Sequence, residues 1–236
     1  MRALLLILAL AACSAPPPGQ DAAAPRGAAP EPQVRPDINA SYLSPDLDVD
    51  DLAEGFSAES REVFAAREAV TAALGIAPGD AVADIGAGTG IHLAPFDAAV
   101  GPGGTVYAVD ISEKLVEYLE DVAARDGFAT VKAVLGEGAT TTLPPASLDL
   151  AFTSNVYHHF ERPAAMNAHL FEAVRPGGRY AILDFRRAGA RDWVQRHVRA
   201  DMATVIEEVS AAGFVFRGEL PVAGLEDNYL IVFERP

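Results

Sequence analysis

Short apolar runs alternate with helix-like segments along most of this chain, and this alternation constrains its fold more than any other feature. Five runs have the length of β-strands: Ala81–Ile85, Thr105–Val109, Val131–Leu135, Leu148–Thr153 and Tyr180–Asp184. Most residues in these runs are apolar, so helices must cover both faces of the sheet that they form. The order of elements therefore predicts a doubly wound α/β domain built on a parallel sheet.

Segments with helical periodicity lie before, between and after these runs. They span Ala58–Leu74, Ile111–Arg125, Pro163–Val174 and Asp201–Ala212. Ser112 and Asp201 are the expected N-caps of two of these helices. Two later runs, Phe214–Glu219 and Tyr229–Phe233, are spaced like a hairpin and bring the sheet to seven strands. The sheet is thus expected to be mostly parallel, with an antiparallel strand at the C-terminal end.

The composition limits the partners of the chain. Its 236 residues carry 18 Lys and Arg against 33 Asp and Glu, a formal net charge of −15 at pH 7. No stretch concentrates basic residues, and so acidic a protein repels phosphate backbones, which argues against a nucleic-acid partner. A single cysteine excludes an intrachain disulfide and a multi-cysteine metal site.

That cysteine, Cys13, follows a segment typical of export signals. Arg2 supplies a positive start, and Ala3–Ala12 is an apolar run too short to span a bilayer as a helix. The run ends in Leu10-Ala11-Ala12-Cys13, which resembles the bacterial lipobox. The resemblance implies a signal peptide over 1–12, a lipid on Cys13 and a place in the bacterial cell envelope, at the outer membrane or facing the periplasm. The alternatives are an ordinary secretory signal and a buried hydrophobic N-terminus, and without processing the protein stays in the cytoplasm.

Residues 13–42 are rich in Pro, Ala and Gly and are expected to form a linker that holds the folded part away from the membrane. The acidic stretch Asp46–Asp51 lacks the glycine and the terminal glutamate of a calcium loop. It is expected to be a solvated turn that leads into a helix. The folded domain is then expected to span residues 43–236.

The most informative turn in the chain is Gly86-Ala87-Gly88-Thr89-Gly90, directly after the first strand. Glycines are needed where a chain turns sharply and where its backbone approaches a ligand without an intervening side chain. The spacing differs from the Gly-x-Gly-x-x-Gly of dinucleotide enzymes, and the lysine of a P-loop is absent. Asp110 follows about 20 residues later, at the end of the second strand, where a carboxylate can accept hydrogen bonds from both ribose hydroxyls of an adenosine group.

Four motifs in order make the chain similar to the class I S-adenosylmethionine-dependent methyltransferases of the small-molecule branch, which includes quinone-biosynthesis C-methyltransferases. The similar region covers roughly residues 79–184. Its motifs are Asp84–Gly90, Tyr107–Asp110, Gly136-Glu137 with Leu143-Pro144 and Ser147–Leu150, and Arg175–Gly178. The resemblance implies a Rossmann-like fold, S-adenosylmethionine as cofactor, a small-molecule substrate, and a helical cap over residues 43–78.

The resemblance also implies the residues that hold the cofactor. Asp84 is expected to orient the glycine loop or to meet the methionine amino group through water, and Asp110 to bind the ribose hydroxyls. Ile111 is expected to cover one face of adenine. Glu137 is expected near the adenine amino group, at a position where the family more often has Asp. The methionine end and the ribose are expected to contact Gly86, Ala87, Gly88, Gly90 and Asn155.

Candidates for catalysis follow the fourth strand, at the carboxyl edge of the sheet where ligands bind in such folds. His158 and Tyr157 are expected to contact the substrate, and His159 either to do so or to hold the loop. Together with His197, the two histidines also suggest a metal site. Adjacent histidines rarely converge on one ion without strain, however, so no metal is predicted.

Two functions from different classes agree with these features. The first is an enzyme that methylates a small molecule, and the second is a membrane-tethered binding protein that keeps the fold without catalysis. The glycine turn and Asp110 favour the enzyme, because a protein that binds no nucleoside has no physical need of either. A nicotinamide oxidoreductase is disfavoured by the glycine spacing.

Overall fold

The computed structural model describes residues 33–58 and 61–236. These described residues belong to one compact unit. The expected signal peptide, Cys13 and most of the expected linker lie outside the described residues. Within the described part of the chain, every helix is too short or too polar to cross a membrane.

The core of the unit is a seven-stranded sheet in the order β3-β2-β1-β4-β5-β7-β6. The strands are β1 (Ala81–Ile85), β2 (Thr105–Asp110), β3 (Val131–Leu135), β4 (Leu148–Ser154), β5 (Val174–Phe185), β6 (Val215–Glu219) and β7 (Asn228–Glu234). Strands β1 to β5 pair with one another in parallel, and β7 runs antiparallel to both β5 and β6. The predicted fold class is confirmed. The order reverses between β1 and β4, which is where ligands bind in open sheets of this kind.

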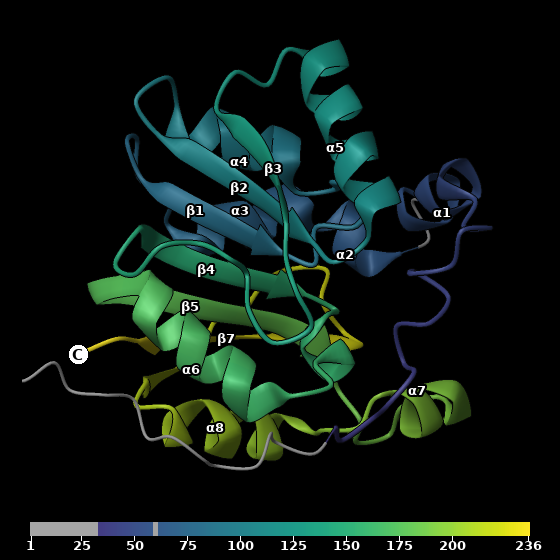
Figure 1. Ribbon diagram of the computed structural model, residues 1–236. Coiled ribbons are helices and arrows are strands. Elements are labelled where there is room, and N and C mark those ends of the chain that lie inside the picture. Colours follow the sequence, from purple (N-terminus) through teal and green to yellow (C-terminus); the bar gives the residue numbers. More distant parts are fainter. Residues whose placement is uncertain (1–32, 59–60) are drawn as a thin grey trace, which may run out of the picture. The chain divides into compact units, whose positions relative to one another are not determined.

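Alternate strand residues point to opposite sides of the sheet, and apolar residues stand on both sides. Helices therefore cover both faces. Val82, Val106 and Leu150 pack against α3 (Arg67–Leu74), α4 (Leu93–Val100) and α5 (Glu113–Asp126). On the other face, Ala151 and Ile182 pack against α6 (Pro163–Ala173) and α8 (Met202–Ala211). Figure 1 shows these two helical layers, with α6 and α8 together on one face.

Most predicted elements have nearly the expected bounds, but β5 begins at Val174 rather than at Tyr180, and one helix differs. The segment expected as a single helix to Leu74 is broken into α2 (Glu62–Ala65) and α3, because Ala66 has a non-helical backbone. Asp201 caps α8 by accepting a hydrogen bond from the Thr204 amide at 2.9 Å. Ser112 occupies the N-cap position of α5, but its side chain makes no capping hydrogen bond.

Three segments that the sequence pattern did not predict lie beyond the carboxyl ends of the parallel strands. The first is α1 (Val49–Phe56), whose N-cap Asp48 belongs to the stretch expected to be a solvated turn. The second is α7 (Asp192–His197), which lies with α1 and α2 past the arrowheads of the strands in Figure 1. The third is residues 34–43, which include the end of the linker expected over 13–42. Here Val34 donates a backbone hydrogen bond to the Glu161 carbonyl at 2.9 Å. The expected spacer therefore extends too far, since these residues pack on the domain.

Candidate active site

A cavity of about 250 Å³ lies at the carboxyl ends of β1, β2, β4 and β5. It is lined by most of the residues predicted to form the site, namely Asp84, Gly86, Ala87, Gly88, Asp110, Ile111, Glu137, Asn155, His158 and His159. Two predicted residues, Gly90 and Tyr157, are not part of its lining. The topological switch point of the sheet thus holds a pocket large enough for a small ligand.

The glycine loop needs its glycines for conformation and for space. Gly86 and Gly88 have φ values of 71° and 56°, in the left-handed region that other residues rarely adopt. A Cβ on Gly86 would lie 2.5 Å from Cγ1 of Val156, which comes directly before the turn after β4. The Gly86 and Ala87 amides both donate to the Val109 carbonyl, at 2.8 and 2.9 Å. The loop is therefore fixed between the ends of β2 and β4.

Gly90 has a different role from the one expected. A Cβ at this position would lie 2.7 Å from Cδ1 of Leu93 and 3.1 Å from Cδ2 of Leu119. Those side chains belong to α4 and α5, so the glycine allows the two helices to pack closely under the loop. Gly90 does not line the cavity, so the structure gives no support to its expected contact with the ligand.

Two buried carboxyl groups define the polar part of the cavity. Asp84 is 2% exposed, and its Oδ2 atom is buried with no hydrogen-bond partner among the described residues. Burial and the nearby charge of Asp110 raise the pKa of Asp84 to about 7. Asp110 accepts hydrogen bonds from the amides of Ser112 and Gly88, at 3.0 and 2.9 Å. It therefore holds the glycine loop in place while keeping further lone pairs for a ligand.

These groups fit S-adenosylmethionine. An unpartnered buried carboxyl oxygen is costly, and an ammonium group of a ligand would satisfy it. The Asp110 carboxylate has the position expected for ribose, and the bare backbone of the loop allows close approach. The exposed Glu137 and the half-buried Ile111 line the same cavity on the side of β2 and β3, where an adenine ring would lie.

The N-terminal region contributes residues that are not among the predicted site residues. Phe56 of α1 contacts the glycine loop, since a Cβ on Gly88 would lie 3.4 Å from Cε2 of Phe56. The guanidinium of Arg61 lies 4.5 Å from the centre of the Phe56 ring. Tyr42 and Asn39 also line the cavity. Their positions depend on how the N-terminal segment folds back, for which the sequence has no local signal.

Tyr157 points into the core rather than into the cavity. The ring is fully buried, and its hydroxyl donates to Oε2 of Glu208 at 2.8 Å and accepts from the Asn167 side chain at 2.9 Å. Burial raises the pKa of the Tyr157 hydroxyl well above its ordinary value. The expected contact of Tyr157 with a substrate is therefore wrong, and the residue braces α6 and α8 instead.

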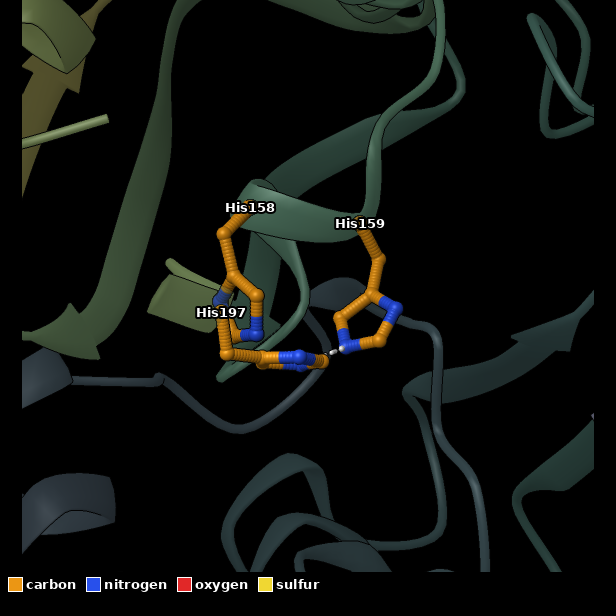
Figure 2. A group of neighbouring side chains, drawn as sticks. All are labelled: His158, His159 and His197. Atoms are coloured by element: carbon orange, nitrogen blue, oxygen red, sulfur yellow. Dashed lines mark hydrogen bonds between the residues drawn. The ribbon is translucent and has the colours of Figure 1, made fainter. Parts of the chain in front are cut away.

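The structure brings His158 and His159 together with His197 (Figure 2). The first two stand on the short turn η1 (Tyr157–His159), and His197 ends α7. One ligand atom from each imidazole lies within 4.8 Å of the others. Adjacent histidines are expected to converge only rarely, yet the tight turn brings both rings together, with centroids 4.4 Å apart.

Each of the two adjacent histidines has a partner that fixes its ring. Nδ1 of His158 lies 2.8 Å from Oδ1 of the fully buried Asp184. Nδ1 of His159 lies 3.1 Å from Oδ1 of Asn39. Burial, together with the neighbouring histidines, lowers the pKa of His159 to about 3, so this imidazole is neutral at physiological pH.

Asn155 directly follows β4, just before the turn that carries His158 and His159, and it lines the same cavity. Its backbone is left-handed, with φ 54°, and its amide donates to the Leu183 carbonyl at 2.8 Å. Its side-chain oxygen accepts a hydrogen bond from Asn228 of β7. Asn155 thus closes β4 with a backbone conformation that asparagine tolerates better than most residues.

The chain resembles known methyltransferases in sequence and in structure. A methyltransferase domain family matches residues 83–182. The nocamycin O-methyltransferase of Saccharothrix syringae is 37% identical over 105 residues, covering 44% of this chain and 38% of that enzyme. A ubiquinone/menaquinone biosynthesis C-methyltransferase of Cupriavidus taiwanensis is 29% identical over 113 residues, covering 48% of this chain and 46% of that enzyme. The chain thus spans less than half the length of these two relatives.

A similar fold occurs in the crystal structure of an S-adenosylmethionine-dependent methyltransferase from Aquifex aeolicus. The two structures superimpose with a TM-score of 0.72 at 23% identity, over 80% of this chain and 99% of that one. This likeness confirms the Rossmann-like fold. The family match and the sequence relatives support methyl transfer and do not favour the non-catalytic alternative.

Proposed function

We propose that this protein transfers the methyl group of S-adenosylmethionine to a small-molecule acceptor. The observation that carries the proposal is the buried pair Asp84 and Asp110, which flanks a glycine loop in a cavity at the switch point of the sheet. A cofactor with an ammonium group, a sulfonium and a ribose matches two carboxyl groups and a bare backbone. The family match over residues 83–182 supports the same donor.

Within this proposal, each half of the cofactor has its own contacts. The Asp84 carboxylate binds the ammonium of the methionine portion, directly or through water, and Asp110 accepts hydrogen bonds from the ribose hydroxyls. The backbone of Gly86, Ala87 and Gly88 lies along the methionine end, next to Asn155. Ile111 and Glu137 take the adenine ring.

The chemistry requires alignment more than it requires acid–base groups. A lone pair of the acceptor forms a bond to the methyl carbon while the carbon–sulfur bond breaks, and its electron pair stays on sulfur as S-adenosylhomocysteine is formed. The chain contributes by aligning the two molecules and by excluding water from the cavity. Phe56 of α1 and Tyr42 of the segment 34–43 line the site, and His158 and His159 line the part that remains for the acceptor.

Binding of S-adenosylmethionine to the full chain tests this proposal. Calorimetry is expected to show one site, and Asp110→Ala is expected to weaken binding by about 100-fold, because a charge-assisted hydrogen bond contributes roughly 1.5–3 kcal/mol. The matched control is Asp121→Ala, an exposed acid on α5. Absence of binding at millimolar cofactor, or equal binding by Asp110→Ala, would contradict the proposal.

We also propose, from the N-terminal sequence, that Cys13 carries a lipid and anchors the protein in the cell envelope. The apolar run Ala3–Ala12 and the tetrapeptide that ends in Cys13 support this location. Labelled palmitate is expected to enter the wild-type chain and not Cys13→Ala. Equal labelling of the two would refute the anchor without bearing on methyl transfer.

A further inference from the structure

We propose that His158, His159 and His197 form a binding site for a divalent first-row transition-metal ion, with zinc as the best match, on the wall of the proposed active-site cavity. All three side chains line that cavity. One nitrogen from each lies within 4.8 Å of the other two, and the three rings point toward one another in Figure 2. Three imidazoles are a known donor set for zinc.

The spacing of the nitrogens agrees with a shared ion. Zinc binds imidazole nitrogen at about 2.0–2.1 Å in tetrahedral geometry, which places two ligand nitrogens about 3.4 Å apart. Nε2 of His159 and Nε2 of His197 are 3.4 Å apart. The centroid of the His158 ring lies 4.4 Å from that of His159 and 5.2 Å from that of His197. The ligand atoms of the three rings, all within 4.8 Å of one another, would need to approach to about 3.4 Å to share the ion.

The partners of the histidines present the correct nitrogen to the ion. Asp184 accepts from Nδ1 of His158, at 2.8 Å, which leaves Nε2 of His158 with its lone pair. The side-chain oxygen of Asn39 can only accept, so Nδ1 of His159 carries the proton and Nε2 is free to bind. A carboxylate behind a histidine ligand is the arrangement that orients the ring and raises its basicity in zinc sites.

A hydrogen bond between two histidines is the simpler explanation of the cluster, and it covers only part of the geometry. Nε2 of His197 could donate to Nε2 of His159, although 3.4 Å is long for such a bond. That bond gives no reason for His158 to lie against both other rings with its own nitrogen fixed by Asp184. A common ligand explains all three orientations.

The position of the site suggests what the ion does. Three protein ligands leave a coordination position open, as in catalytic zinc sites. His158, His159 and His197 line the same cavity as Gly86 of the glycine loop, so an ion held by them would lie within the cavity proposed for the cofactor and the acceptor. A hydroxyl or thiol acceptor bound there would lose its proton to water more readily, and the resulting anion would attack the methyl carbon. This role rests on the proposed methyl transfer, whereas binding of the ion does not.

Zinc titration of the full chain, purified in mild detergent and without a histidine tag, tests the inference. Calorimetry is expected to show one zinc per chain, and cobalt is expected to give the visible absorption of a four-coordinate ion. His197→Gln is expected to weaken zinc binding by about 100-fold, and Asp184→Asn by about 10-fold to 100-fold. The control is His169→Gln, because His169 is equally half-buried but pairs with Thr140 and Thr141, outside the cluster.

The outcomes separate the two proposals. Zinc binding that is absent below millimolar concentration, or that is unchanged in His197→Gln, overturns the metal site. Binding of S-adenosylmethionine is measured on the same preparations, with circular dichroism to show that each variant is folded. Cofactor binding without zinc binding leaves methyl transfer standing and refutes the metal site. Zinc binding without cofactor binding supports the metal site and refutes the proposed methyl transfer.

Discussion

The two halves of the cavity are built in different ways. The proposed cofactor half comes from consecutive elements, since Asp84, the glycine loop and Asp110 stand at the ends of the neighbouring strands β1 and β2. The proposed acceptor half is assembled from three segments far apart in the chain, namely residues 34–43, η1 and α7. The first half depends on local backbone geometry, whereas the second depends on contacts between side chains that are far apart in the sequence. The two halves should therefore fail differently when they are altered.

The largest effect is expected from Gly86→Ala, which alters the cofactor half. A methyl group there would lie 2.5 Å from Val156 on a backbone with φ 71°, so the loop must move. Binding of S-adenosylmethionine is expected to fall by more than about 100-fold, as measured by calorimetry.

Two further variants sharpen this test. Gly103→Ala is the control, because a Cβ on Gly103 would meet only an atom at 4.0 Å. In the double variant Gly86→Ala with Val156→Ala, part of the binding is expected to return, since the nearest obstructing atoms are removed. Full binding by the single variant would show that the loop does not lie against the turn after β4.

The next effect concerns pH and the buried acid of the cofactor half. Folding raises the pKa of Asp84 from 3.8 to about 7, so between these values the folded protein holds a proton that the unfolded chain releases. The contribution of Asp84 to the stability of the ligand-free protein is therefore fully present below about pH 4. It is lost as pH rises toward 7. The loss amounts to at most about 4 kcal/mol.

Asp84→Asn removes this titration. Urea unfolding at several pH values between 4 and 7 is expected to show a steeper decline of stability in the wild type than in Asp84→Asn. Asp121→Asn, which changes an exposed acid, is expected to follow the wild type. Parallel curves for wild type and Asp84→Asn would mean that this carboxyl group is not protonated in the folded state.

The contrast between the halves also explains how far the sequence could predict the structure. Strand-and-helix alternation and the glycine turn are local signals, so the doubly wound sheet, the loop and Asp110 could be predicted. The direction of Tyr157 could not, because it depends on Glu208 and Asn167 from two other helices. The contact between His197 and η1 likewise depends on where α7 packs, and residue spacing along the chain does not predict that position.

Tyr157→Phe is expected to have a smaller effect and to test the boundary of the acceptor half. The change removes a hydroxyl that makes two buried hydrogen bonds, so stability is expected to fall by about 1–3 kcal/mol in urea unfolding. Because the hydroxyl faces α6 and α8, affinity for S-adenosylmethionine is expected to stay within about twofold of the wild type. A large loss of cofactor affinity with unchanged stability would instead place the tyrosine in the site.

The smallest effect is expected from Asn39→Ala, which alters the N-terminal segment of the acceptor half. The Asn39 side chain donates to the His159 carbonyl at 3.1 Å and accepts from Nδ1 of the same residue. Its loss removes hydrogen bonds at the edge of the domain and is expected to cost about 1 kcal/mol in urea unfolding. If the acceptor half is assembled independently of the cofactor half, cofactor affinity stays unchanged while zinc affinity falls, because the His159 ring is no longer oriented. A parallel loss of both affinities would mean that residues 34–43 hold the whole cavity together, and the division into two halves would no longer describe it.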